Sequence, residues 1–312
     1  MALQSPQFKH VVVIGPGAIG CCLAVRLALA GPNVTLIDHR PDRAERLSAQ
    51  PIRIHTPAGD LEARIPVRTA PDAPPDLVLL ATKAYSAGAA AGTATAWIGR
   101  APLVCFQNGL GVTREVAAAL PQTNVITAVS YQAANFMREG EVNHVAILRT
   151  HLGYEGRGPD DVVRAVADLL GRAGYEPRVE ADMTPLVWGK LIVNAAINPV
   201  AALAGVTNGE VAARPTLRAL AARVAAEAEA VARARGITLP YAGGVQAMME
   251  TARGTADNRC SMLQDLEAGR PTEIDYLNGA VAAVAEGCGV AAPANRAIAA
   301  LIRQVSTVKI AS

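Results

Sequence analysis

The chain has 312 residues, which is enough for about two domains of ordinary size. Its 29 Lys and Arg residues nearly balance its 27 Asp and Glu residues, and a formal charge of +2 argues against nucleic acid as the main partner. Hydrophobic residues make up 51% of the chain and charged residues 18%, a composition that excludes disorder and predicts a large buried core.

Short β-branched segments alternate with helical segments in the first half of the chain. Strands are expected over 10–14, 33–38, 76–82, 102–106 and 124–130, and helices over 18–30, 86–98 and 112–120. This alternation predicts an α/β fold with a parallel sheet. Two segments depart from it: residues 52–67 are expected to form a hairpin around Ala58-Gly59, and residues 131–154 to form further β structure.

From about residue 182 the pattern changes to long Ala-, Leu- and Arg-rich stretches with helical periodicity. Helices are expected over 184–204, 208–235, 243–268, 272–288 and 293–308. We therefore predict an α/β domain over residues 1–180 and an all-α domain over residues 181–312.

A glycine turn follows the first expected strand. Gly15, Gly17 and Gly20 form the pattern GxGxxG, with Ala18 and Ile19 opening a helix. In this context the first glycine permits the turn, the second lets a pyrophosphate approach the backbone, and the third lets helix pack on strand. The pattern predicts a Rossmann dinucleotide-binding domain rather than a plain strand-to-helix turn.

Residues at the ends of later strands bear on the choice of cofactor. Asp38 lies eighteen residues after Gly20, where a carboxylate binds ribose hydroxyls and favours NAD. His39 and Arg40 follow directly, and an arginine there can pair with the 2′-phosphate of NADP. Lys83 and Asn108 follow two later strands, at the sheet edge where ligands bind.

A polar line crosses an otherwise apolar helical stretch. Lys190, Asn194 and Asn198 are spaced four residues apart, so they share one helix face. Such polar groups either form a structural network or line a substrate cleft. A second polar cluster, with Asn258, Ser261 and Glu273, is open to the same two interpretations, or to roles as caps and surface charges.

Targeting and metal signals are weak. The five cysteines are odd in number and none has zinc-ligand spacing, which indicates a reduced, cytoplasmic protein without a structural metal. No apolar run of about 18 residues is uninterrupted, so we expect no membrane partner.

Taken together, these motifs resemble the ketopantoate reductases (2-dehydropantoate 2-reductases) over essentially the whole chain. The segments that carry the resemblance are GPGAIG at 15–20, TK at 82–83, QNG at 107–109, KLIVNAAINPVAAL at 190–203, NGE at 208–210 and NRCSMLQD…TEID at 258–275. It implies a Rossmann domain followed by an all-helical domain, with the site in the cleft between them. It also implies NADPH-dependent reduction of ketopantoate to D-pantoate, a step of pantothenate biosynthesis.

The resemblance assigns roles to individual residues. Lys190 matches the general acid, with Glu273 beside it in the catalytic site, and Lys83 matches a cofactor-binding lysine. The positions that contact substrate or cofactor match Asn108, Asn194, Asn198, Asn208, Asn258, Ser261 and Glu273. A homodimer is expected by analogy.

One position departs from the family pattern. The family usually has a small or apolar residue and then an arginine after the second strand, whereas this chain has Asp38 and His39, with Arg40 one place later. This leaves NAD and NADP open. It also leaves two alternatives: an NAD-dependent D-2-hydroxyacid dehydrogenase similar to D-mandelate dehydrogenases, and a non-catalytic regulator that binds NAD(H). In each enzyme interpretation the substrate is a small 2-oxo acid or its hydroxy acid.

Overall fold

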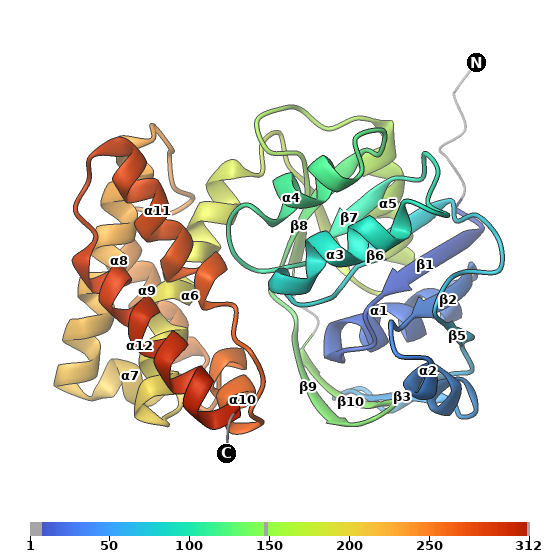
Figure 1. The fold of residues 1–312 in the computed structure, drawn as a ribbon, viewed down its shortest axis with the longest axis horizontal. Helices are drawn as coiled ribbons and strands as arrows, with labels where there is room; N and C mark the ends of the chain where they lie inside the picture. The colour runs from blue at the N-terminus through green and yellow to red at the C-terminus, as the bar shows by residue number, and fades with distance from the viewer. Residues whose placement is uncertain (1–7, 147–148, 311–312) are drawn as a thin grey trace. The chain divides into compact units, whose positions relative to one another are not determined.

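The computed structural model describes residues 8–146 and 149–310, which form two compact units. The first unit runs to Gln107 and resumes from Val112 to Met183. The second unit contains the short segment Asn108–Gly111 together with the chain from Thr184 onward. Figure 1 shows β strands in the first unit and helices in the second, as the sequence predicts for the fold class.

An eight-stranded sheet forms the centre of the first unit, in the order β12-β11-β8-β7-β6-β1-β2-β5. All neighbouring pairs are parallel except β11 with β8. The strands are β1 (His10–Ile14), β2 (Asn33–Ile37), β5 (Val67–Arg68), β6 (Leu77–Leu80), β7 (Leu103–Cys105), β8 (Val125–Ser130), β11 (Arg149–Gly153) and β12 (Glu176–Val179). Strands β1, β6 and β7 are fully buried, apart from the first residue of β1, as is expected of a parallel sheet covered on both faces.

A second sheet of four strands has the order β4-β3-β10-β9. The predicted hairpin is confirmed: β3 (Ile52–His55) and β4 (Leu61–Ala63) pair antiparallel around the turn at Gly59. β10 (Glu141–Ala146) pairs antiparallel with β9 (Ala133–Arg138) and parallel with β3. This long-range pairing joins two segments that local sequence patterns leave separate.

The described residues of the first unit form five helices. They are α1 (Ala18–Leu29), α2 (Pro41–Ser48), α3 (Ala84–Ala94), α4 (Val112–Ala119) and α5 (Asp161–Arg172). α1 contacts both sheets, and its buried side chains join the core formed by alternate residues of β1 and β6. Figure 1 shows α3 and α4 in front of the main sheet, and they pack against each other.

The second unit is helical, and the helices predicted over 184–204 and 293–308 are confirmed, whereas the other three predicted ranges divide into shorter elements. The range 208–235 splits into α7 (Asn208–Ala213) and α8 (Pro215–Ala234), because Pro215 holds Arg214 in an extended conformation. The range 243–268 splits into α9 (Gly244–Gly254) and α10 (Ser261–Glu267). The range 272–288 becomes a 3-10 turn, η1 (Ile274–Tyr276), and then α11 (Asn278–Cys288), before α12 (Pro293–Ile310).

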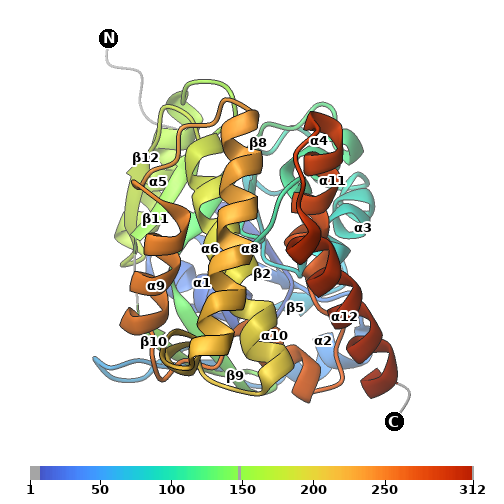
Figure 2. The ribbon, with the colours of Figure 1, turned by 90° about the vertical axis from the view of Figure 1, so that its left-hand side faces the viewer.

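Helix α6 (Thr184–Ala204) is the centre of the second unit and contacts α7, α8, α9, α10 and α12. Figure 2 shows α8 running alongside it. Of the described helices, α6 alone has the length and hydropathy of a membrane span. However, 67% of its apolar window is buried, as in the core helix of a globular unit.

Candidate active site

Each glycine of the turn after β1 has a distinct steric role. Gly15 has φ +101°, and a Cβ there would meet the backbone of Thr82 at 3.0 Å. A Cβ on Gly20 would lie 1.9 Å from the carbonyl oxygen of Gly15, so only glycine lets α1 pack this closely. Gly17 is different, because a Cβ there would meet nothing within 4 Å. The space above Gly17 is the cradle that a pyrophosphate needs.

The start of α1 supports the same use. Gly17 is its N-cap and offers no side-chain cap, and the first turn contains no acidic residue. The half-buried Ala18 and Ile19 open the helix. Free N–H groups and the positive end of the helix dipole therefore favour a bound anion at this point.

Polar atoms collect where β6 and β7 end, beside the glycine turn. The side-chain amide of Gln107 donates to the carbonyls of Leu80 (2.9 Å) and Thr82 (3.1 Å), which ties the two strand ends together. Within the described structure, Oγ1 of Thr82 and Oε1 of Gln107 are buried without a hydrogen-bond partner. Lys83 is half-buried and occupies the N-cap position of α3. Such orphaned polar atoms fit a site that is completed by a ligand.

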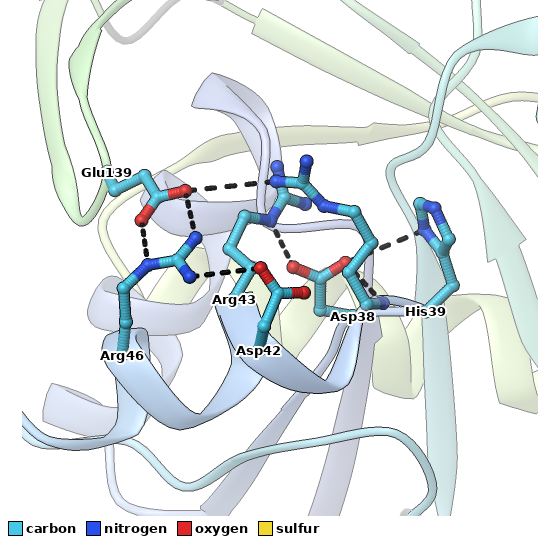
Figure 3. Close-up of polar contacts among 7 residues, drawn as sticks. Asp38, His39, Asp42, Arg43, Arg46 and Glu139 are labelled. Atoms are coloured by element: carbon cyan, nitrogen blue, oxygen red, sulfur yellow. Dashed lines mark hydrogen bonds and ion pairs between the residues drawn. The ribbon is translucent and has the colours of Figure 1, made fainter.

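The surroundings of Asp38, at the end of β2, differ from those that the sequence predicts. Its carboxylate is fully buried and forms an ion pair with Arg43, and it also accepts a hydrogen bond from the backbone N–H of Arg40 at 3.2 Å. His39 lies 3.5 Å from the same carboxylate with 88% of its side chain exposed. Figure 3 shows this cluster. The carboxylate predicted to receive a ribose is therefore occupied by a guanidinium of its own chain.

The cluster extends to the second sheet of the first unit. Arg46 bonds Asp42 and Glu139 at 3.0 Å, and Arg40 lies 3.8 Å from Glu139 (Figure 3). Glu139 lies in the turn between β9 and β10, so these ion pairs join α2 to that hairpin. Three arginines and three carboxylates balance in charge.

In the second unit, α6 presents the predicted polar line. Lys190, Asn194 and Asn198 are each half-buried, whereas most of their neighbours along the helix are buried. The spacing of four residues places them on one accessible face of a core helix. Gly189, the residue before Lys190, is closely packed, because a Cβ there would lie 2.8 Å from the Pro240 side chain. The carbonyl of Gly189 accepts a hydrogen bond from the Tyr241 hydroxyl at 3.0 Å.

Electrostatics distinguish Lys190 from a surface lysine. Burial lowers the pKa of its ammonium group from 10.5 to about 8, and the negative charge of Glu273 acts in the opposite direction. Glu273 is itself buried, just before η1. An ammonium group with a pKa near neutrality is suited to giving and taking a proton.

Asn108 belongs to the second unit because its segment packs on the Glu273 turn. The backbone N–H of Leu110 donates to the carbonyl of Tyr276 at 2.9 Å. Gly109 has φ +99°, and a Cβ there would lie 2.6 Å from the same carbonyl. Oδ1 of Asn108 is buried without a partner within the described structure. The contact therefore brings Asn108 and Glu273 onto adjoining loops.

The remaining predicted residues divide into two groups. Asn258 and Ser261 are exposed, and Ser261 is the first residue of α10 while Asn258 lies in the loop before it. Cys260 between them donates its thiol to the carbonyl of Asn198 at 3.4 Å, which holds this loop against α6. Asn208 is buried, and its side-chain amide donates to Thr255 at 2.9 Å. Its Oδ1 has no partner in the described residues.

Known proteins are similar to this chain over most of its length. The family model of ketopantoate reductase PanE/ApbA matches residues 11–156, and that of the ketopantoate reductase PanE/ApbA C terminal matches residues 182–306. The 2-dehydropantoate 2-reductase of Halobacterium salinarum is 33% identical over 297 residues, which cover 94% of this chain and 98% of that protein. The chain belongs to the ketopantoate reductase family.

Solved structures share the fold of this ketopantoate reductase family member. A PanE/ApbA family ketopantoate reductase from Ralstonia eutropha JMP134 has a TM-score of 0.88 at 28% identity and covers 96% of this chain and 99% of its own. D-mandelate dehydrogenase with NADH and anilino(oxo)acetate also has a TM-score of 0.88, at 22% identity, over 96% of this chain and 99% of its own. The family and the glycine turn together indicate a nicotinamide cofactor.

Three residues that contact the candidate residues are not apparent in the sequence. Arg43 pairs with Asp38, Tyr276 holds the Asn108 segment, and Thr255 bonds Asn208. Pro41 is typical of the start of a helix, and it predicts that Arg43 lies in the first turn of α2, close to Asp38. The other two contacts join distant segments and carry no local signal.

The glycine turn gives a test that separates binding from folding. Gly17→Ala should raise the dinucleotide Kd at least about tenfold while Tm changes by less than about 2 °C, because its Cβ fills only the ligand cradle. Gly20→Ala should lower Tm by at least about 3 °C, because its Cβ overlaps the Gly15 carbonyl. Fluorescence titration and thermal unfolding measure the two effects.

Gly92→Ala is the matched control, because Gly92 lies in α3 with open space around its Cβ position. It should leave the dinucleotide Kd unchanged and should not lower Tm, because alanine favours the helix more than glycine does. A Gly17→Ala variant that binds the dinucleotide normally would contradict the assigned cradle.

Proposed function

We propose that this chain reduces ketopantoate to D-pantoate, with Lys190 as the general acid. The observation that carries the proposal is the accessible line of Lys190, Asn194 and Asn198 on a core helix, with Glu273 acting on the lysine. Membership of the ketopantoate reductase family supports the substrate. A binding regulator needs no proton donor, so this line favours an oxidoreductase.

The residues of the chain divide the chemistry between them. A reduced nicotinamide supplies a hydride to the carbonyl carbon of the substrate when it is bound. The Lys190 ammonium stabilises the negative charge that develops on the carbonyl oxygen and donates the proton that completes the hydroxyl group. Glu273 keeps the lysine protonated and orients the substrate hydroxyl. The candidates that hold the substrate by neutral hydrogen bonds are Asn108, Asn194, Asn198, Asn208, Asn258 and Ser261.

The pKa of Lys190 sets the expected pH dependence. Reduction needs the protonated amine, so kcat for ketopantoate should be level below about pH 8 and fall about tenfold per pH unit above it. Oxidation of D-pantoate needs the neutral amine, so its kcat should rise about tenfold per pH unit up to about pH 8 and be level above it. Lys190→Ala should lower kcat at least about 10²-fold and abolish both limbs.

Lys9→Ala is the control for this experiment, because Lys9 is an exposed lysine just before β1. It should keep the wild-type rate and pH profile. A near-normal kcat in Lys190→Ala would refute the general-acid role.

A D-2-hydroxyacid dehydrogenase is the second candidate, and Asp38 at the position typical of NAD-binding enzymes is the observation that favours it. The two activities separate in one assay at 340 nm with ketopantoate and with phenylglyoxylate. Rapid turnover of ketopantoate supports the first proposal. Turnover of phenylglyoxylate alone would replace it with the second.

For the cofactor, we propose NADPH rather than NADH. A free Asp38 carboxylate would repel a 2′-phosphate, but this carboxylate is buried and neutralised by Arg43. The side chains left accessible beside it are those of His39 and Arg40. An accessible guanidinium at this point supports binding of a phosphate.

Removal of Arg43 should reverse this preference. Arg43→Ala leaves the Asp38 charge unpaired, so the ratio of KM for NADPH to KM for NADH should rise at least about tenfold. Arg46→Ala is the control, because Arg46 bonds Asp42 and Glu139 but not Asp38, and it should change the ratio less than about threefold. Steady-state kinetics with both cofactors measure the ratio, and equal shifts in the two variants would contradict a specific role for Arg43.

We also propose, from the family resemblance, that the chain is a cytoplasmic homodimer. Light scattering of the purified protein tests the dimer, since a mass near twice 32.3 kDa is expected.

A further inference from the structure

Helix α6 contains a proline, and this proline breaks the hydrogen-bond ladder beside the polar line. Pro199 has no N–H, so the carbonyl of Ala195, four residues earlier, loses its donor within the helix. Ala195 is itself buried, so water does not replace that donor easily. The carbonyl lies directly after Asn194 and one turn before Pro199, within the segment that carries Asn194 and Asn198.

The missing donor comes from another helix. Asn278, the first residue of α11, is fully buried and donates its side-chain amide to the Ala195 carbonyl at 3.0 Å. The same amide nitrogen donates to Oδ1 of Asn295 at 3.0 Å. Both partners are acceptors, so they fix the orientation of the Asn278 amide.

Asn295 is anchored in turn. It is buried in the first turn of α12 and donates its side-chain amide to the carbonyl of Val224 at 3.1 Å and to Glu227 at 3.2 Å. Glu227, buried on α8, also accepts the backbone N–H groups of Ala294 and Asn295, at 2.9 and 3.1 Å. A carboxylate at a helix N-terminus forms strong, directional bonds of this kind.

Glu227, Asn295 and Asn278 thus form a chain of buried hydrogen bonds, called the relay below. It runs from α8 through α12 and α11 to the turn of α6 that Pro199 interrupts. Figure 2 shows α8 beside α6, and α11 and α12 pack against each other and against α8. None of Asn278, Asn295 and Glu227 is assigned to substrate or cofactor above. The relay ends on the Ala195 carbonyl, to which Pro199 offers no N–H.

We propose that Asn278 is a positioning residue for the reaction: it holds the proline-interrupted turn of α6 so that Lys190, Asn194 and Asn198 keep their common alignment. This inference rests on the proposed function of that line. Its physical basis is that a displacement of about 1 Å in a catalytic group can lower a rate by about 10²-fold. Asn278 acts through the backbone of Ala195 and touches none of the three side chains.

The decisive experiment combines Asn278→Ala with Pro199→Ala. Asn278→Ala alone should lower kcat for ketopantoate at least about tenfold, with the dinucleotide Kd unchanged within about twofold. Pro199→Ala restores an N–H that can bond the Ala195 carbonyl, so in that background the same change at Asn278 should cost less than about threefold. Kinetics and Tm are measured for the wild type, the two single variants and the double variant, which together form a double-mutant cycle.

Val231→Ala is the stability control, because Val231 is fully buried on α8 and lies outside the relay. It should lower Tm while kcat stays near wild type. If Asn278→Ala likewise lowers Tm and leaves kcat unchanged, the role is merely structural and the proposal is overturned. Equal losses in both backgrounds would overturn the link to Pro199.

Asn278→Ser is the second variant if Asn278→Ala does not fold, because its hydroxyl keeps some polarity but is too short to span the same bond. It should also lower kcat at least about tenfold with the dinucleotide Kd unchanged, and a lower Tm with unchanged kcat would contradict the proposal. Lys190→Ala separates this inference from the proposed function: loss of activity there with a normal Asn278 variant refutes only the positioning role of Asn278, whereas a near-normal kcat in Lys190→Ala refutes the general-acid role on which the inference rests.

Discussion

Helix α6 imposes the constraint on which the second unit depends: one helix is both the hydrophobic core and the carrier of a polar, protonatable line. Its buried faces contact five other helices, and its remaining face carries the half-buried Lys190, Asn194 and Asn198. Burial of the lysine among apolar side chains lowers its pKa to about 8, which a surface helix would not do. Packing and chemistry are therefore set by the same element.

The first unit meets a comparable conflict at the end of β2. A carboxylate at Asp38 is buried where the strand meets the nucleotide-binding edge, and a buried charge needs a partner. Arg43 supplies it from the first turn of α2, and Arg46 extends the ion pairs to Glu139 (Figure 3). The structure thus pairs this carboxylate within its own chain, which the position of Asp38 in the sequence does not indicate.

Long-range polar contacts complete both units. Tyr276 draws the segment Asn108–Gly111 into the helical unit, although the sequence places this segment after a strand of the sheet. Asn278 bonds a carbonyl 83 residues away in α6. These contacts hold the segment of Asn108 and the helix of the lysine line in place, and the bond of Asn278 to Ala195 is the harder one to replace because both residues are buried.

The sequence by itself determined the fold class, the glycine turn, the main strands and the spacing of Lys190, Asn194 and Asn198, because these depend on local periodicity and on residues close in the chain. It also predicted the hairpin at Gly59. Only the tertiary structure decided that Arg43 covers Asp38, that residues 208–235 and 243–268 break into separate helices, and that the Ala195 carbonyl finds its donor on α11. Those outcomes depend on which distant groups meet in a water-excluded interior, and no local pattern encodes that meeting.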